Sequence, residues 1–251
     1  MFKSLRTPVI IGHRGASLHA PENTLAAFKL AVDQAAVAIE FDVKLTSDRQ
    51  VVVIHDPGVA RTTDGQGLVS KLSLEEIKDL DAGTWFSSNF KDERIPTLEE
   101  VFDVVGRKVL MNIELTNYTT PSDSLVEKVI DLIKRKGLED RIYFSSFLAT
   151  NLIKARKLLP GCGIGYLIYA GPARMLQMIF QSPPHSIDSV NPYRGSVSQR
   201  VVEHEHGLGR RILVYTVNDA DEMRKLFKIG VDGIFTDDPL TGNKVASEFI
   251  H

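Results

Sequence analysis

Two carboxylates, those of Glu40 and Asp42, are separated by one residue within the otherwise apolar stretch 37–43. In an extended strand this spacing directs both side chains to the same face. Neighbouring carboxylates repel each other, and burying them without a countercharge is costly. A solvated strand face would avoid that cost, but the apolar neighbours of the pair argue against it. A hard divalent cation, Mg²⁺ or Ca²⁺, would resolve the conflict because both ions take carboxylate oxygens as ligands.

A third carboxylate, that of Glu114, comes at the end of another apolar stretch, residues 109–114. If these stretches are strands of a parallel barrel, as the alternation described below predicts, their carboxyl ends meet on one side of the barrel. The side chain of Glu114 is then expected beside Glu40 and Asp42. Three acidic residues on adjacent strands predict a metal site with Glu40, Asp42 and Glu114 as its protein ligands. These residues do not distinguish Mg²⁺ from Ca²⁺.

A histidine and an arginine stand between two glycines, in the sequence Gly12-His13-Arg14-Gly15 after an apolar run. Polar residues at the carboxyl end of a barrel strand face the active site. The glycines allow backbone conformations, and a close approach of substrate, that other residues resist. The guanidinium of Arg14 carries a fixed charge in a geometry that suits a phosphate oxyanion. Arg14 is therefore a candidate phosphate ligand.

A second histidine, His55, precedes Asp56 and follows the apolar run 51–54. Two imidazoles near a divalent ion suit a general acid and a general base at near-neutral pH. Both could instead be metal ligands, but three carboxylates already make an all-oxygen site, so acid/base roles for His13 and His55 are favoured. The only cysteine, Cys162, is expected to be structural. Metal, arginine, two histidines and no nucleophilic serine or cysteine motif together indicate phosphodiester cleavage.

Short β-branched runs alternate with helical patterns along the chain. The runs are continuously apolar, as expected of parallel strands covered on both faces. Expected strands cover residues 8–12, 37–42, 109–114, 141–145, 163–168, 187–191, 211–216 and 233–236. Expected helices cover residues 24–35, 99–105, 122–136, 149–159, 173–180, 198–206 and 220–229. This alternation predicts an α/β fold, a (β/α)₈ TIM barrel in one domain over residues 1–251, with a doubly wound open sheet as the alternative.

One segment interrupts the alternation. The polar turn 46–50 is too short for a crossover helix, so the run 51–55 must return antiparallel as a hairpin arm. A hairpin beyond the carboxyl rim of the barrel would bring His55 back to the level of the carboxylates. The Gly-, Asp- and Ser-rich stretch 56–96 is expected to be an insertion over the barrel mouth.

Composition limits the classes of partner. The formal net charge is −2 and no block of Lys or Arg stands alone, so nucleic acid is not an expected partner. Residues 1–8 lack the apolar core of a signal peptide, and the apolar run 9–11 is far too short to span a membrane. We expect a cytoplasmic protein without stable membrane insertion, and the sequence does not indicate an oligomeric state.

Two further features allow a structural explanation, which for the first is one of two alternatives. Trp85 and Phe86 lie in the stretch 56–96, where they would form either an apolar wall for a substrate or the small core of that stretch. Asp237-Asp238-Pro239 follows the last expected strand, and helix capping with turn formation accounts for it.

Taken together, these residues resemble the glycerophosphodiester phosphodiesterase family. The motifs that carry the resemblance occur in the family's order, from the first expected strand to the last. They are His13-Arg14-Gly15, Pro21-Glu22-Asn23-Thr24, Glu40-Phe41-Asp42-Val43, His55-Asp56, Ile113-Glu114-Leu115, Thr216-Val217-Asn218 and Thr236-Asp237-Asp238-Pro239. The resemblance implies a barrel with an inserted subdomain after the second strand and a divalent metal ion as cofactor.

The resemblance also implies that small-molecule glycerophosphodiesters are hydrolysed to sn-glycerol 3-phosphate and an alcohol. Glu40, Asp42 and Glu114 correspond to the metal ligands of the family. His13 and His55 correspond to its acid/base pair. In such enzymes the glycerol hydroxyl next to the phosphate attacks phosphorus, and water then opens the cyclic phosphate.

Three positions depart from the family's pattern. Thr116 stands where a lysine is usual, which removes a positive charge expected near the phosphate. Leu148 stands where an acidic residue is common. Tyr215 replaces the usual tryptophan but keeps a stacking surface, so Tyr215 and Arg14 are the expected substrate-binding residues.

Two other functions are open at this point. The same chemistry could act on lysophospholipid or sphingolipid headgroups, for which Trp85, Phe86 and Phe90 would supply an apolar wall. A catalytically silent binding barrel is the other, with Thr116 as its only positive support.

Overall fold

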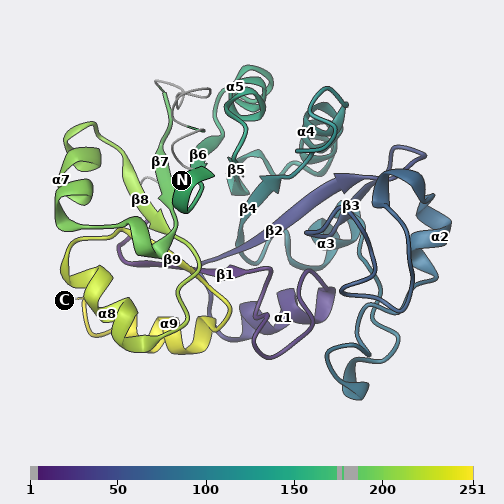
Figure 1. Cartoon of the computed structure of the whole chain (residues 1–251), viewed down its shortest axis with the longest axis horizontal. Coiled ribbons are helices and arrows are strands. Elements are labelled where there is room, and N and C mark those ends of the chain that lie inside the picture. Colours follow the sequence, from purple (N-terminus) through teal and green to yellow (C-terminus); the bar gives the residue numbers. More distant parts are fainter. Residues whose placement is uncertain (1–4, 174–176, 178–185, 251) are drawn as a thin grey trace.

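Eight parallel strands close into a barrel within residues 5–173, 177 and 186–250, which the computed structural model of the chain describes (Figure 1). These eight strands are β1 (Val9–His13), β2 (Ala38–Leu45), β4 (Leu110–Leu115), β5 (Ile142–Ser146), β6 (Gly163–Ile168), β7 (Ser189–Pro192), β8 (Arg211–Val214) and β9 (Gly233–Thr236). A further short strand, β3 (Val51–Val53), pairs antiparallel with β2. The order is β1-β9-β8-β7-β6-β5-β4-β2-β3, and pairing of β1 with β2 closes the ring. The predicted TIM barrel is confirmed, and the open-sheet alternative is wrong.

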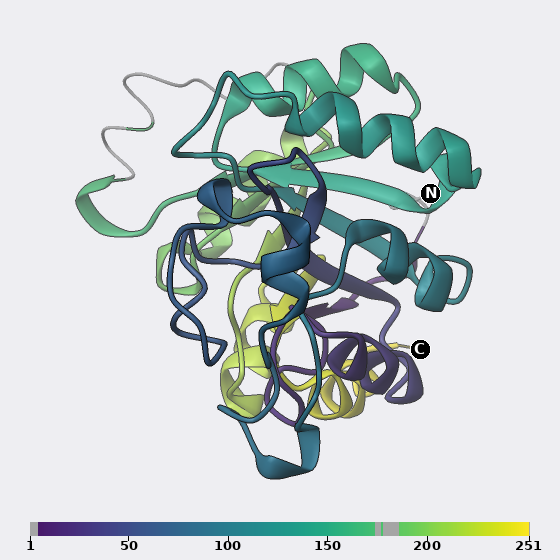
Figure 2. The same cartoon turned by 90° about the vertical axis from the view of Figure 1, so that its right-hand side faces the viewer.

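The helices lie outside the ring of strands, as Figures 1 and 2 show from two directions. They are α1 (Leu25–Asp33), α2 (Leu74–Lys78), α3 (Leu98–Val105), α4 (Leu125–Lys136), α5 (Ala149–Leu158), α7 (Gln199–Gly207), α8 (Ala220–Lys228) and α9 (Pro239–Ala246). The helix expected over residues 173–180 falls mostly outside the described residues. Among the described helices, none has the length and apolar character needed to cross a membrane.

Capping residues explain where two of these helices begin. The Thr97 side chain accepts from the N–H of Glu100, and the Glu100 carboxylate accepts from the N–H of Thr97 at 2.7 Å. This reciprocal capping box starts α3. Asp238 accepts from the N–H of Thr241 at the start of α9, where Pro239 occupies the first turn. The predicted capping role is therefore confirmed for Asp238.

The inner face of the barrel changes from apolar to polar along its axis. Its apolar cluster comprises Val9, Ile11, Ala38, Leu110, Tyr143, Leu213 and Phe235. Alternate residues of a strand share a face, so in β1 the next inward residue is His13. In β4, Leu110 is followed on the same face by Asn112 and Glu114. The polar layer therefore lies at the carboxyl ends of the strands, where barrel enzymes carry their sites.

The short strand β3 returns antiparallel to β2, with Val43 opposite Val53, as the turn length predicted. Past the paired residues, the N–H of Ile54 donates to the C=O of Asp42 at 3.0 Å. This bond holds the following residue, His55, beside the carboxylates of β2.

The segment between β3 and α3 has an apolar core of its own. That core comprises Val52, Ile54, Val59, Val69, Ile77, Ala82 and Ile95. The ring of Phe86 makes edge contacts with Trp85 and Phe90, both at 5.7 Å between centroids. None of these three rings lines the cavity at the barrel mouth. The three rings therefore pack against one another outside this core, with Trp85 42% exposed, and they form no wall of the cavity. That the segment is an inserted subdomain stays a prediction.

The single cysteine lies within the apolar core. Cys162 is 2% exposed, and burial raises the pKa of its thiol to about 11. A thiol of this kind is a poor nucleophile at neutral pH, which agrees with the structural role expected for it.

Candidate active site

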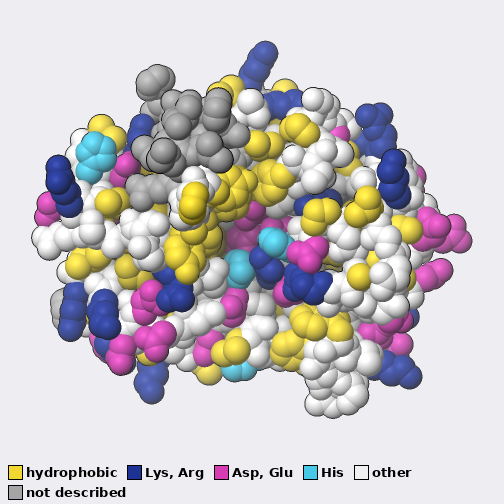
Figure 3. All heavy atoms as spheres, in the orientation of Figure 1, with side chains coloured by type: hydrophobic (Ala, Val, Ile, Leu, Met, Phe, Trp, Pro, Cys, Tyr) yellow, Lys and Arg dark blue, Asp and Glu magenta, His cyan; other side chains and the backbone are white. Residues whose placement is uncertain are grey.

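A cavity of about 200 Å³ opens at the carboxyl ends of the barrel strands. Its lining residues are His13, Arg14, Glu40, His55, Glu114, Ser145, Phe147, Leu167, Tyr215, Thr216 and Phe235. Figure 3 shows a hollow in the middle of this face, with histidine, acidic and basic side chains in it and hydrophobic side chains along its upper and left edges. A larger hollow of about 660 Å³, beside residues 49–51 and helix α4, contains none of the predicted site residues.

The three predicted metal ligands come together in this cavity region. Asp42 of β2 lies opposite Glu114 of β4 in the strand register. One carboxylate oxygen from each of Glu40, Asp42 and Glu114 lies within 4.8 Å of the others. Within the described residues, Glu40 Oε1 and Asp42 Oδ1 are buried without a hydrogen-bond partner. Orphaned anionic oxygens beside a third carboxylate fit the all-oxygen ligand set that a hard divalent cation takes.

Burial and mutual repulsion govern the charges of this cluster. Burial, together with the charges of Asp42 and Glu114, holds the pKa of Glu40 well above its usual value. Burial and the charge of Asp42 also raise the pKa of Glu114 to about 8. Burial works in the same direction on Asp42, but the positive charge of Arg14 lowers the pKa of that carboxyl. A bound cation would relieve the repulsion that disfavours the ionised forms.

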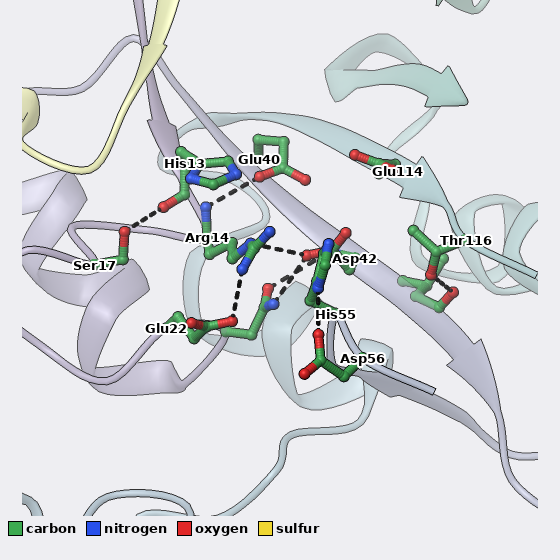
Figure 4. Close-up of polar contacts among 12 residues, drawn as sticks. His13, Arg14, Ser17, Glu22, Glu40, Asp42, His55, Asp56, Glu114 and Thr116 are labelled. Carbon is green, nitrogen blue, oxygen red and sulfur yellow. Dashed lines mark hydrogen bonds and ion pairs between the residues drawn. The ribbon is translucent and has the colours of Figure 1, made fainter. Parts of the chain in front are cut away.

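Arg14 lies among three carboxylates (Figure 4). Its backbone N–H donates to Glu40 Oε2 at 3.0 Å, and its Nη1 donates to Glu22 Oε1 at 2.9 Å. Its Nε lies 3.4 Å from Asp42 Oδ2. These contacts fix a positive charge at the wall of the cavity, beside the carboxylate cluster.

The glycines around His13 and Arg14 serve packing. A Cβ on Gly15, whose φ is +89°, would lie 2.7 Å from the backbone carbon of Ala27 in α1. A Cβ on Gly12 would lie 2.9 Å from the carbonyl oxygen of Gly15. The positive φ of Gly15 is a conformation that other residues resist, as expected, and both glycines permit a close approach of the chain to itself. Close approach of a substrate stays a prediction.

Each histidine of the cavity is held by an aspartate. Nδ1 of His13 lies 2.7 Å from Asp237 Oδ1, and Nδ1 of His55 lies 2.6 Å from Asp56 Oδ1. A hydrogen bond from Arg61 lowers the pKa of Asp56 to about 2. Although burial opposes it, the bond from His13 also lowers the pKa of Asp237 to about 2. Both carboxylates are thus acceptors at neutral pH, so each Nδ1–H donates and each Nε2 is left for proton exchange.

The contact of Asp237 with His13 was not predicted from the sequence. Asp237 also accepts from Ser17 Oγ at 2.9 Å and from Asn218 Nδ2 at 2.5 Å. The capping interpretation of Asp237-Asp238-Pro239 therefore holds for Asp238 but is wrong for Asp237. The only signal in the sequence was that this motif belongs to the family pattern, which by itself assigned it no partner.

Aromatic rings form one wall of the cavity. The ring of Tyr215 contacts that of Phe147 edge to face at 6.0 Å, and Phe147 stacks on Tyr169 at 4.1 Å. The hydroxyl of Tyr215 donates to the C=O of Ile168 at 2.7 Å. The hydroxyl is therefore engaged by the barrel, and the ring is the part of Tyr215 that offers a surface to a substrate.

A lysine lies beside position 116 although none occupies it. Nζ of Lys44 donates to both the carbonyl oxygen and Oγ1 of Thr116, each at 2.9 Å. Burial lowers the pKa of Lys44, against the opposing effect of Asp42 and Glu114. Neither Lys44 nor Thr116 lines the cavity, so this pair does not replace a phosphate-facing lysine directly.

The chain is similar over most of its length to known phosphodiesterases. Residues 13–241 match the model of the Glycerophosphoryl diester phosphodiesterase family. The chain is 42% identical over 234 residues to the glycerophosphodiester phosphodiesterase of Caldanaerobacter subterraneus, covering 93% of this chain and 95% of that relative. It is 38% identical over 231 residues to the putative glycerophosphodiester phosphodiesterase YhdW of Bacillus subtilis, covering 92% and 94%. A solved Oleispira antarctica phosphodiesterase, in complex with the product sn-glycerol-3-phosphate, has a TM-score of 0.87 at 32% identity, covering 96% of this chain and 97% of that one.

Proposed function

The chain belongs to the glycerophosphoryl diester phosphodiesterase family, and we propose that it hydrolyses glycerophosphodiesters to sn-glycerol 3-phosphate and an alcohol. The observation that carries this proposal is the cavity lined by Glu40, Glu114 and two aspartate-held histidines, with the carboxylate of Asp42 close to those of Glu40 and Glu114. The similarity to the Oleispira antarctica enzyme, solved with sn-glycerol-3-phosphate, supports the same product here.

Glu40, Asp42 and Glu114 would hold the divalent cation, Mg²⁺ or Ca²⁺. Their oxygens are close enough together to share one ion, and two of them lack any partner among the described residues. When bound, such an ion supplies Lewis-acid polarisation of the phosphoryl group and offsets its negative charge.

The two histidines would move the protons of the reaction. Attack by the neighbouring glycerol hydroxyl on phosphorus forms a P–O bond and releases a proton, which one imidazole accepts at Nε2. The P–O bond to the alcohol breaks, and the other imidazole donates a proton to the leaving oxygen. Water then opens the cyclic phosphate with the two proton transfers reversed. Asp237 and Asp56 stabilise the imidazolium that forms on His13 or His55.

Arg14 and Tyr215, which both line the cavity, would bind the substrate. The guanidinium of Arg14, fixed by Glu22 and Asp42, places positive charge beside the phosphoryl oxygens of the bound diester. The ring of Tyr215, packed on Phe147, offers an apolar surface to the carbon atoms of the glycerol or of the alcohol.

A small substrate fits the site better than an acylated one. The cavity of about 200 Å³ is below the range of roughly 300–1,000 Å³ typical of pockets for drug-sized ligands. Trp85, Phe86 and Phe90, which would have favoured a lysophospholipid, pack against one another instead of lining the cavity. These features support a soluble glycerophosphodiester over a lysophospholipid or sphingolipid headgroup.

An activity screen with Mg²⁺ or Ca²⁺ added tests the proposal. Release of choline is measured from glycerophosphocholine, where sn-glycerol 3-phosphate is the other product, and from lysophosphatidylcholine, where the other product is lysophosphatidic acid, with and without a chelator. We expect metal-dependent turnover of glycerophosphocholine. Preferred turnover of lysophosphatidylcholine would mean that lysophospholipids are the substrates instead. Binding without turnover by metal-loaded protein would mean that the protein binds the diester without catalysing its hydrolysis.

A further inference from the structure

Arg61 contacts two carboxylates of the candidate active site, that of Asp56, which holds His55, and that of Glu22, which holds Arg14. Its side chain lies in the segment after β3, is 45% exposed and does not line the cavity. We propose that Arg61 is a positioning residue that orients His55 through Asp56 and Arg14 through Glu22 at the same time. This inference rests on the proposed function, because it concerns how the residues of that reaction are held.

The first connection, from Arg61 to His55, is made through Asp56. Nε of Arg61 donates to Asp56 Oδ2 at 2.6 Å, and Nη2 donates to Asp56 Oδ1 at 3.2 Å. Asp56 Oδ1 is also the atom that accepts from Nδ1 of His55. A carboxylate held at both oxygens cannot rotate without losing a charged hydrogen bond, so the imidazole bonded to it keeps one orientation.

The second connection, from Arg61 to Arg14, is made through Glu22. Nη1 of Arg61 donates to Glu22 Oε2 at 2.7 Å, and Nη2 donates to Glu22 Oε1 at 2.8 Å. The same Oε1 accepts from Nη1 of Arg14, whose Nε faces Asp42. Charges of alternating sign therefore run from Arg61 through Glu22 and Arg14 to the carboxylate cluster. In Figure 4, Glu22 and Asp56 lie on the same side of Arg14 and His55, away from Glu40 and Glu114.

The arrangement needs the planar fork of an arginine. Three nitrogens of Arg61 serve four oxygens, two on each carboxylate. A lysine offers one ammonium and cannot span both carboxylates in this geometry. Without Arg61, the carboxylates of Glu22 and Asp56 would lie close together and repel each other, so both would shift.

A positioning role is separable from a role in stability. Exposed ion pairs contribute little to folding stability, so loss of Arg61 should leave the protein folded. Arg224 is a matched control, because its guanidinium also joins two carboxylates: two bonds of 2.8 Å to Glu248 and one of 3.0 Å to Asp221. Its side chain is 35% exposed, and it lies on α8, apart from the cavity.

The first experiment compares Arg61→Ala, Arg61→Lys and Arg224→Ala with the wild type. We expect Arg61→Ala to lower kcat and to raise KM, each by about tenfold, the lower end of the range for residues that orient catalytic groups. Compared with Arg61→Ala, Arg61→Lys should restore only part of kcat or part of KM, because a lysine reaches only one of the two carboxylates. Arg224→Ala should change neither constant, while both alanine variants lower the melting temperature by a similar small amount.

The second experiment separates the connection through Asp56 from the connection through Glu22. Asp56→Asn should lower kcat with little change in KM, and Glu22→Gln should raise KM with little change in kcat. If Arg61 acts through them, Arg61→Ala/Asp56→Asn has a kcat no lower than the more impaired parent. Arg61→Ala/Glu22→Gln likewise has a KM no higher than the more impaired parent. Fully additive losses in both pairs would overturn the inference.

A binding measurement keeps this inference apart from the proposed function. Calorimetric titration with sn-glycerol 3-phosphate, with Mg²⁺ present, needs no turnover. We expect Arg61→Ala to weaken this binding by about tenfold, and Arg224→Ala to leave it unchanged. A wild type that binds but does not turn over would contradict the proposed function alone. Unchanged kcat, KM and product affinity in folded Arg61→Ala would contradict the positioning role alone.

Discussion

The imidazole of His13 and the carboxylate of Asp237 are in contact at 2.7 Å, although 224 positions separate them in the chain. The contact exists because β9 pairs with β1, with Gly12 opposite Thr236, so that residues following the two strands meet. Ser17 and Asn218 hold the carboxylate in turn. The first histidine of the candidate site is thus oriented from the last strand of the barrel.

Replacement of Asp237 by asparagine should impair turnover more than binding. The amide no longer fixes the Nδ1–H tautomer of His13, so we expect kcat to fall by about 10- to 100-fold with little change in KM. Initial rates over a range of glycerophosphocholine concentrations measure both constants. Asp238→Asn is the control, because Asp238 caps α9 and should affect stability only. A normal kcat in Asp237→Asn would remove this role.

Replacement of either cavity histidine by alanine should nearly abolish turnover. Each imidazole is assigned a proton transfer, and loss of such a group costs about 10²- to 10⁴-fold in kcat. Single-turnover rates of His13→Ala and His55→Ala measure the loss, with circular dichroism as a check of folding. A folded variant with the wild-type rate would exclude that histidine from acid/base catalysis.

Asp237 should also make folding stability depend on pH in acid. Burial opposes its ionisation, yet the bond from His13 lowers its folded-state pKa from 3.8 to about 2. A lowered folded-state pKa contributes stability above the unfolded-state pKa, and this is lost as pH falls toward the folded value. Between about pH 5 and pH 3, the wild type should lose about 1 kcal/mol more than Asp237→Asn. Urea unfolding at both pH values measures the difference, and equal losses would contradict it.

Glutamine at position 40 should separate metal binding from stability. Glu40 is buried among like charges, so Glu40→Gln is expected to leave the melting temperature of chelated protein unchanged or higher. Added Mg²⁺ or Ca²⁺ should raise the melting temperature of the wild type but not that of the variant. Scanning calorimetry in chelator and in metal compares the two. An equal metal-induced rise in both proteins would contradict the ligand role of Glu40.

Replacing Thr116 by the lysine that the resemblance led us to expect should destabilise this chain. Thr116 is 3% exposed and its Oγ1 accepts from Lys44. In Thr116→Lys two ammonium groups would compete for one buried place, which we expect to cost about 1–3 kcal/mol of folding free energy. The double variant Lys44→Thr/Thr116→Lys should regain most of that loss, as urea unfolding would show. Wild-type stability in the single variant would contradict the prediction.

The chain's own periodicity determined the barrel and the carboxylate cluster. Continuous apolar runs alternating with helical patterns are short-range signals, and they predicted the eight parallel strands. The spacing of Glu40 and Asp42 placed both on one strand face, and the short turn 46–50 required the hairpin that returns His55. Such inferences hold because strand geometry repeats every two residues regardless of the rest of the fold.

Only the tertiary structure decided which side chains hold these groups in place. Asp237 reaches His13 because the ring of strands closes between β9 and β1. No local sequence pattern can predict a contact between residues so far apart in the chain. Arg61 joins Glu22 to Asp56 because the segment after β3 packs against the loop after β1. Hydrogen bonds of this kind depend on the side-chain conformations of residues far apart in the chain, so the residue types alone do not reveal them.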